Sequence, residues 1–215
     1  MHYLIVAGGT PNELPNDVIG LGPFDMVVCA NGGVHNAMRL GLVPNIVVGD
    51  LDSLSTTERT RLEATQCRFL IHPAAKDETD LELALLWCAA QGATKITVIG
   101  AFGDRPDHTL ANLLLLTHRR LRSIEVCLYS RRWRVWLVRH QITLTGRIGD
   151  TVSLIPITAR VTGIETQGLE YPLHGQSLLR GPARGVSNVM TAPVASVRCR
   201  SGLLMVMHGP PQAEL

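Results

Sequence analysis

The sequence predicts an α/β N-terminal domain with a mostly parallel sheet, followed by an all-β sandwich C-terminal domain. In the first half, short β-branched runs alternate with helical patterns, which is typical of a parallel sheet flanked by helices. After about Tyr129 the helical periodicity disappears, and alternating stretches are separated by Gly, Pro and Asn. We therefore expect two domains, residues 1–130 and residues 131–215.

Six apolar runs are the expected strands of the first domain: YLIVA (3–7), MVVCA (26–30), NIVV (45–48), RFLIH (68–72), KITVI (95–99) and IEVCLY (124–129). Capping boxes predict two helix starts, Ser55 with Glu58 and Thr79 with Glu82. The second of these helices should end near Gly92, because glycine is favoured just after a helix. A further helical run, HTLANLLLL, follows the fifth strand.

Composition narrows the classes of function. The chain has 215 residues and a formal net charge of +2, too small to indicate a nucleic-acid or membrane-surface protein. No apolar run reaches the roughly 18 residues needed to cross a bilayer, and the N-terminus lacks the basic region of a signal peptide. Five scattered cysteines without a C-x-x-C pair indicate buried thiols in a reducing compartment. We expect a cytoplasmic protein.

Acidic residues follow the third and fourth expected strands, where ligands usually bind in α/β sheets. Asp50 and Asp52 in GDLDS can direct two carboxylates to one side, and such hard oxygen donors suit Mg²⁺. The alternative is that they shape a turn, although Ser55 already supplies the next N-cap. Asp77 and Asp80 in KDETD begin a helix, where the helix dipole alone stabilises carboxylates.

Two other loops carry candidate residues. The loop GAFGDRPDH combines permissive glycines with Arg105, Asp107 and His108, and Arg offers a bidentate fork to phosphate oxygens. The structural alternatives are that Asp107 caps the helix and His108 is a packing residue. Asn31, in ANGG after the second strand, is explained by a simple Asn-Gly turn.

The combination says more than its parts. Three acidic clusters and an arginine-bearing glycine loop would converge on one edge of the sheet, and so many like charges would repel without a cation among them. A divalent metal with a polyphosphate satisfies both signs. The pattern therefore predicts phosphoryl or pyrophosphoryl transfer, in which catalysis is mainly positioning and charge neutralisation.

At these residues the sequence resembles the thiamine pyrophosphokinase family. GDLDS is similar to the family's GDFDS, KDETDLELAL to its K/Q-D-x-T-D-x-x-x-A-L element, and GAFGDRPDHTLANL to its G-A-x-G-G-R-x-D-H-x-L-A-N loop and helix. In the second domain, GLEYPLHGQSLLRGPARGVSN and GLLMVMH resemble the family's G-x-x-Y-P-L, S-N and G-x-L-x-V sequence. The resemblance covers nearly the whole chain in order.

The resemblance implies transfer of the β,γ-diphosphate of ATP to the hydroxyethyl oxygen of thiamine, with release of AMP. It implies an ATP- and metal-binding domain at 1–130, a thiamine-binding β-sandwich at 131–215, and a homodimer with thiamine between subunits. By position, it implies that Asp50, Asp52 and Asp80 ligate Mg²⁺ and that Asp107 joins these three as a fourth catalytic acid. It also implies that a second set of residues contacts ATP or thiamine: Arg105, His108, Lys76, Asp77, Thr79, Asn31, Ser187 and Asn188.

Four positions depart from the family pattern. Asn31 replaces the Asp of A-D-G-G, which removes a charge, and Leu51 replaces the Phe of GDFDS. Asp104 replaces the second Gly of GGR and adds a negative charge beside the phosphates. Val189 replaces the Glu that commonly follows S-N, which affects thiamine recognition.

Three other functions remain open on the sequence. A pyrophosphokinase acting on another alcohol, such as a hydroxymethylpterin, would use the same metal and phosphate groups. A non-catalytic nucleotide or thiamine sensor would bind ligand without producing AMP. In the third, the acids form a solvated helix-start face and the β domain is an interaction module. The repetition of acids after successive strands disfavours this last reading.

Overall fold

The computed structural model describes residues 1–214, which divide into two compact units. The N-terminal unit is Met1–Arg131, and the C-terminal unit begins at Arg132.

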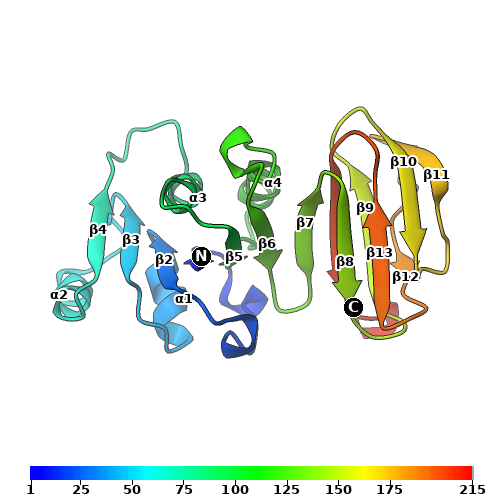
Figure 1. The fold of residues 1–215 in the computed structure, drawn as a ribbon. Helices are drawn as coiled ribbons and strands as arrows, with labels where there is room; N and C mark the ends of the chain where they lie inside the picture. Colours follow the sequence, from blue (N-terminus) through cyan, green and yellow to red (C-terminus); the bar gives the residue numbers. More distant parts are fainter. Residues whose placement is uncertain (215) are drawn as a thin grey trace. The chain divides into compact units, whose positions relative to one another are not determined.

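A parallel sheet forms the centre of the N-terminal unit (Figure 1). Its strands stand in the order β6-β5-β1-β2-β3-β4, and every neighbouring pair is parallel. The bounds are β1 His2–Val6, β2 Met26–Ala30, β3 Ile46–Gly49, β4 Arg68–Ile71, β5 Lys95–Ile99 and β6 Glu125–Tyr129. The order reverses at β1, because the chain adds β2, β3 and β4 on one side of it and then β5 and β6 on the other.

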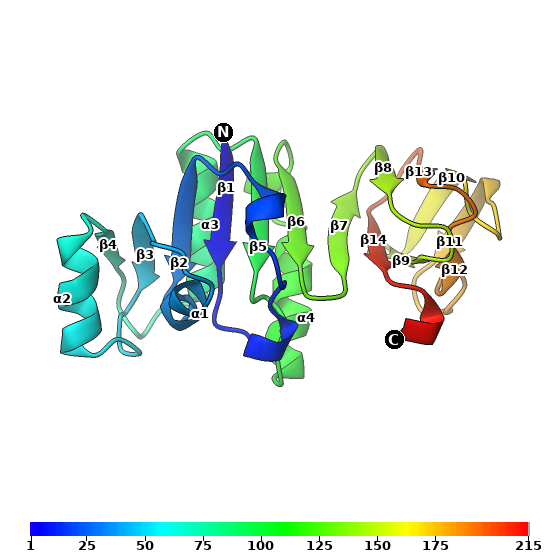
Figure 2. The same ribbon diagram turned by 90° about the horizontal axis from the view of Figure 1, so that it is seen from below.

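Helices cover both faces of this sheet, with α1 and α2 on one side and α3 and α4 on the other (Figure 1). Their bounds are α1 Gly33–Arg39, α2 Thr56–Ala64, α3 Asp80–Ala90 and α4 Pro106–Leu115, with short 3-10 helices at η1 Pro11–Glu13, η2 Ile19–Leu21 and η3 Arg119–Leu121. Figure 2 shows α1 and α2 from their own side of the sheet. This is a doubly wound arrangement, in which ligands bind beyond the carboxyl ends of the strands.

The sequence predictions for this unit are largely confirmed. All six expected strands form, and each one begins and ends within one residue of its expected bounds. The capping box of Ser55 with Glu58 is complete, whereas Thr79 accepts a hydrogen bond from Glu82 N as one half of a box. Helix α1 was not predicted, because its seven residues follow Gly32 without a side-chain cap.

Alternate residues of the strands face a shared apolar core. Leu4 and Val6 of β1 pack in one buried cluster with Val34 of α1 and Leu62 of α2. This cluster packs α1 and α2 against the sheet, so the loop that follows β1 begins at a tightly packed strand.

The C-terminal unit is a sandwich of antiparallel strands, as the sequence predicts. One layer has the order β12-β9-β14-β7 and the other β11-β10-β13-β8. The bounds are β7 Arg134–Val138, β8 Gln141–Thr145, β9 Thr151–Pro156, β10 Arg160–Gln167, β11 His174–Leu179, β12 Asn188–Val189, β13 Val194–Arg198 and β14 Leu204–Gly209, followed by the 3-10 helix η4 Gln212–Glu214. Residues of both layers, among them Leu154, Ile164 and Val206, share one buried core.

None of the helices within residues 1–214 is long and apolar enough to cross a membrane.

Burial controls the chemistry of the cysteines. All five cysteines are buried. Because burial disfavours the thiolate, it raises the pKa of Cys67 to about 11 and of Cys88 to about 12, and it also raises the pKa values of Cys29 and Cys199.

We expect the folded protein to react with Ellman's reagent at pH 8 far more slowly than a free thiol does. Raised pKa values keep Cys29, Cys67, Cys88 and Cys199 protonated at pH 8, and burial keeps the reagent away from all five thiols. The absorbance of released thionitrobenzoate measures the reaction, and unfolding in guanidinium should release all five equivalents. Rapid labelling of one thiol in the folded protein would contradict its burial.

Candidate active site

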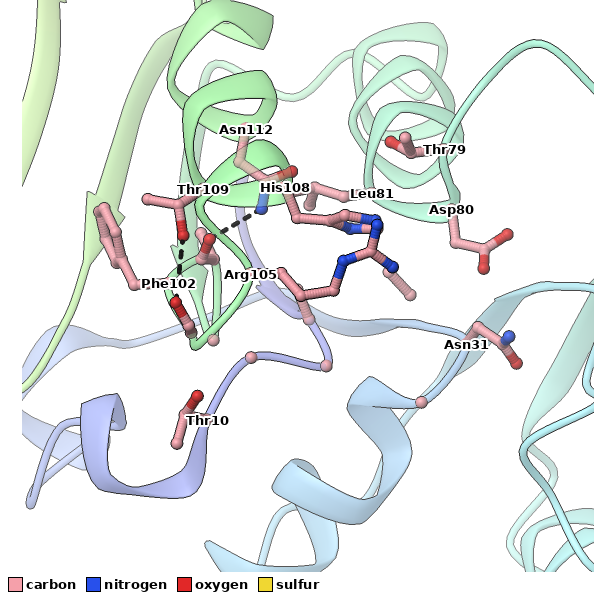
Figure 3. A pocket seen from close by; sticks show the side chains of 18 of the residues that line it. Thr10, Asn31, Thr79, Asp80, Leu81, Phe102, Arg105, His108, Thr109 and Asn112 are labelled. Carbon is pink, nitrogen blue, oxygen red and sulfur yellow. Dashed lines mark hydrogen bonds between the residues drawn. The ribbon is translucent and has the colours of Figure 1, made fainter.

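A cavity of about 560 Å³ opens at the carboxyl edge of the parallel sheet, where the strand order reverses between β1 and β5. Figure 3 shows side chains from α3 and α4 directed into it. The lining residues are Ala7–Pro11, Ala30–Gly32, Thr79–Leu81, Gly100–Arg105, His108, Thr109 and Asn112. This is the position expected of a ligand site in a doubly wound fold.

The floor of the cavity is backbone from two adjacent loops. Gly9 N donates to Gly100 O at 2.8 Å, and Thr10 N donates to Phe102 O at 3.0 Å. A Cβ on Gly9 would lie 2.1 Å from Phe102 O, so only glycine permits this approach. Gly8, Gly9 and Thr10 are site residues that the sequence motifs did not predict. Two glycines directly after the first expected strand were the available signal.

The first acidic pair is held by Asn31. Asn31 Nδ2 donates to Asp50 Oδ1 at 2.9 Å and to Asp52 Oδ1 at 3.0 Å, while Ser53 Oγ donates to Asn31 Oδ1 at 3.0 Å. Leu51 has a φ of 62°, and this left-handed turn brings both carboxylates toward one amide. Asn31 also has a positive φ, 38°, which asparagine tolerates better than most residues. Asn31 lines the cavity, whereas Asp50 and Asp52 lie behind it and do not.

The third acid is paired with a lysine. Asp80 begins α3, lines the cavity, and lies against Gly49, where a Cβ would come within 3.1 Å of Asp80 Cγ. Lys76 Nζ lies 3.0 Å from Asp80 Oδ1 and donates to Pro73 O, and the lysine side chain is only 13% exposed. The ammonium also lowers the pKa of Asp50, after the larger effect of the hydrogen bond from the Asp52 backbone. The Lys76 ammonium therefore offsets the charge of Asp80, and the Asn31 amide bridges Asp50 and Asp52.

These carboxylates suit Mg²⁺ in their chemistry, since Mg²⁺ prefers hard oxygen donors. Asp80 Oδ1 is buried and accepts no hydrogen bond from any residue of 1–214. Its contact with Lys76 is an ion pair without hydrogen-bond alignment. In this same part of the chain, no three His, Cys, Asp or Glu side chains are already arranged to hold an ion. Oxygen donors of the kind that Mg²⁺ prefers are therefore present, and Asn31 bonds only the Oδ1 atoms of Asp50 and Asp52.

The remaining candidates of the N-terminal unit fall into two groups. Arg105 and His108 line the cavity, as does Asp80, and Figure 3 shows these three side chains. Asp107 does not line it and instead accepts from Arg105 Nη2 at 2.5 Å. Hydrogen bonds from Arg105 and from the His108 backbone lower the pKa of Asp107 to about 2, which makes it a weak base.

Two further candidates lie at the start of α3. Thr79 lines the cavity, but its side chain also caps the helix by accepting from Glu82 N, as the expected capping box of these two residues predicts. Asp77 is exposed and outside the cavity lining.

In the C-terminal unit, Asn188 is buried and its side chain is engaged with backbone. Asn188 Nδ2 donates to Tyr171 O at 2.8 Å, and Asn188 Oδ1 accepts from Tyr171 N at 3.0 Å. Tyr171 itself is 64% exposed. Ser187 has a φ of 60°, and its amide donates to Ser153 Oγ. The sequence therefore places two candidate residues on one well-supported loop.

Comparison with known proteins decides the family. Residues 22–128 match the family model "Thiamin pyrophosphokinase, catalytic domain", and residues 139–204 match "Thiamin pyrophosphokinase, vitamin B1 binding domain". The chain belongs to the thiamine pyrophosphokinase family. The resemblance noted in the sequence is confirmed, and so is the expected activity, formation of thiamine diphosphate by pyrophosphoryl transfer from ATP.

Individual relatives agree with this assignment. The thiamine pyrophosphokinase of Bacillus subtilis is 26% identical over 207 residues, which cover 95% of this chain and 96% of that protein. The crystal structure of the Bacillus subtilis protein has a TM-score of 0.87 to this chain over 98% of it and 99% of the crystallised chain. The enzyme of Geobacillus thermodenitrificans is 27% identical, with a TM-score of 0.85 over the full length of both chains. The predicted fold class is confirmed.

The two glycines of the first loop allow a direct test of the cavity floor. Gly9→Ala forces a Cβ onto the Phe102 carbonyl, so we expect a loss of about 2 kcal/mol in the free energy of unfolding and weaker ATP binding. Gly8→Ala is the matched control, because its Cβ would meet nothing closer than 3.6 Å. Urea denaturation and ATP titration measure the two effects. A Gly9→Ala protein with wild-type stability would show that the loops do not approach as described.

Proposed function

We propose that this thiamine pyrophosphokinase binds ATP with Mg²⁺ at the cavity of the N-terminal unit and transfers the β,γ-diphosphate to the hydroxyl of thiamine, leaving AMP. The observation that carries the proposal is the cavity at the strand-order reversal, with a backbone floor and with Arg105 and Asp80 on its wall. Backbone amides and a guanidinium suit phosphate oxygens, and carboxylates suit the cation that accompanies them.

We assign the acidic residues as Mg²⁺ ligands: Asp50, Asp52 and Asp80. When bound, Mg²⁺ supplies charge neutralisation for the phosphates and their orientation. If Asp80 held the cation, the Lys76 ammonium that is now paired with it would be available to a phosphate oxygen. Asn31 would likewise exchange its two carboxylate contacts for another partner.

Arg105 and His108 are proposed phosphate contacts, because both line the cavity. Asp107 holds the Arg105 guanidinium in place, and its low pKa argues against its acting as the base. The proton of the thiamine hydroxyl would then pass to Asp50, Asp52 or Asp80. A primary alcohol is a poor nucleophile at neutral pH, so its alignment with the β-phosphorus is the main contribution of the protein.

For the acceptor, a match to a vitamin B1 binding domain over residues 139–204 supports thiamine over a pterin alcohol. We propose that Ser187 supports thiamine binding directly, and that Asn188 does so by holding the loop of Tyr171. Exposed Tyr171 offers an aromatic face, which suits the planar and cationic rings of thiamine. We also propose that the protein works in the cytoplasm, a reducing compartment that suits its buried cysteines.

Incubation with thiamine, ATP and Mg²⁺ should produce equal amounts of thiamine diphosphate and AMP, separated by chromatography. Chelation by EDTA should abolish both products, because the three carboxylates need the cation. Asp52→Asn should lower kcat by about a hundredfold and weaken Mn²⁺ binding measured by calorimetry. Glu63→Gln, an exposed change in α2, is the control with wild-type values.

The outcomes of this assay separate the alternatives. ADP in place of AMP would overturn diphosphate transfer. Binding of thiamine and ATP without turnover would favour the sensor. Faster turnover of a hydroxymethylpterin than of thiamine would move the activity to that alcohol. Full turnover of Asp52→Asn would remove Asp52 from the metal site.

We propose a homodimer in which the C-terminal unit of one subunit helps to hold thiamine for the other. The resemblance to the family supports this arrangement. Light scattering should give about twice the chain mass of 23.4 kDa, and mixing Asp52→Asn with Ser187→Ala subunits should restore part of the activity that each variant lacks alone. An active monomer, or mixed subunits without recovered activity, would exclude a shared site.

A further inference from the structure

A buried asparagine outside the cavity lies directly beneath its floor. Asn36, on α1, is 5% exposed and is not among the residues that line the cavity. Its Nδ2 donates to Ala7 O at 2.8 Å and to Gly9 O at 2.9 Å. One amide therefore binds the carbonyls on both sides of Gly8, in the loop that follows β1.

The same amide also lies against the neighbouring loop. A Cβ on Gly100 would come within 3.3 Å of Asn36 Nδ2 and within 2.3 Å of Ala7 O. The head of Asn36 thus stands at the junction of the loops after β1 and β5, where the strand order reverses.

The position of Asn36 is itself fixed by close packing. Helix α1 begins at Gly33, where a Cβ would lie 2.0 Å from Val6 O, so the helix backbone touches β1. Val34 and Ala37, on either side in the helix, belong to the buried core with Val6. Asn36 is consequently held by a rigid element, whereas the loop that it binds contains two glycines and has little stiffness of its own.

We propose that Asn36 is a positioning residue for the nucleotide: it acts through the Ala7–Gly9 backbone and sets the shape of the cavity floor. This inference rests on the proposed function, because it takes ATP as the ligand of the cavity. Asn36 touches no substrate. Its loss lets the glycine loop move, so a bound nucleotide loses contacts with the floor while the catalytic carboxylates at β3 and α3 stay in place.

The test is Asn36→Ala in the full-length protein with Mg²⁺. We expect the dissociation constant for ATP, measured by calorimetry, and the KM for ATP to rise roughly tenfold. We expect kcat at saturating ATP and the KM for thiamine to change by less than about twofold, because the change removes binding common to ground and transition states. Asn36→Ser, which retains one hydroxyl donor, should fall between wild type and Asn36→Ala.

Two control variants separate positioning from loss of stability. Asn45→Ala removes an amide that accepts from Val27 N at the opposite edge of the same sheet. Leu62→Ala removes a buried side chain of α2 from the core that also supports α1. Both should destabilise the protein, as urea unfolding would measure, yet leave the ATP dissociation constant at its wild-type value.

Each outcome decides the matter. Unchanged ATP affinity in Asn36→Ala, or an equal loss of affinity in Leu62→Ala at matched stability, would overturn the positioning role. If Asn36→Ala does not fold, Asn36→Ser decides by the same criterion. A wild-type protein that binds no ATP would overturn the proposed function and this inference with it, whereas wild-type binding with unaltered variants would overturn the inference alone.

Discussion

The close approach of two backbone segments at the reversal of strand order is the constraint on which the site depends. Ala7 N donates to the last carbonyl of β5, that of Ile99, and Gly9 N and Thr10 N donate to carbonyls of the loop that follows it. A side chain at Gly9 would occupy the space of the Gly100 and Phe102 carbonyls, and a side chain at Gly100 would occupy that of the Ala7 carbonyl. The absence of side chains gives the cavity a floor of backbone, and the helices on opposite faces leave the space above it open. Polar backbone in a concave position is a general solution for binding phosphate.

The charges of the acidic residues place a second constraint on the site. Three carboxylates lie close together at the ends of β3 and the start of α3, and two unit charges about 4 Å apart interact by about 4 kcal/mol in a partly screened setting. Asn31 donates to two of them without adding charge, and Lys76 offsets the third. An aspartate at position 31 would instead add a fourth negative charge to the same cluster. The asparagine therefore holds two of the carboxylates together without adding to the negative charge of the cluster.

The sequence predicted the elements whose signal is local. β-branched runs marked all six strands of the parallel sheet, and the Ser55 box marked the start of α2. Because acids follow successive strands, their convergence could be inferred before the geometry was known. The short helix α1 was missed, since a glycine pair precedes it and looks like a turn. Its role depends on contact with β1, which lies 27 residues or more away from it in the chain and leaves no local pattern.

It was harder to predict what each residue does in the candidate site than to predict which residues belong to it. Asp107 belongs to a charged motif, yet its carboxylate is committed to Arg105. Asn36 carries no motif at all, because a buried asparagine has the same letter as one on the surface. Only the structure shows that its amide replaces water for two carbonyls, and each such buried group costs about 1–3 kcal/mol if it is left unpaired.

In each of the two units, a buried asparagine side chain holds a backbone segment in position. In the C-terminal unit, Asn188 binds both the N–H and the C=O of Tyr171, so the amide determines where an exposed ring stands. In the N-terminal unit, Asn36 binds the glycine loop that follows β1 and determines its position. A planar amide suits this task, because it binds backbone groups in fixed directions and carries no charge that would require compensation in a buried position. Rigid, neutral supports of this kind leave the charged residues free to exchange partners when substrates bind, which a site built around a highly charged ligand requires.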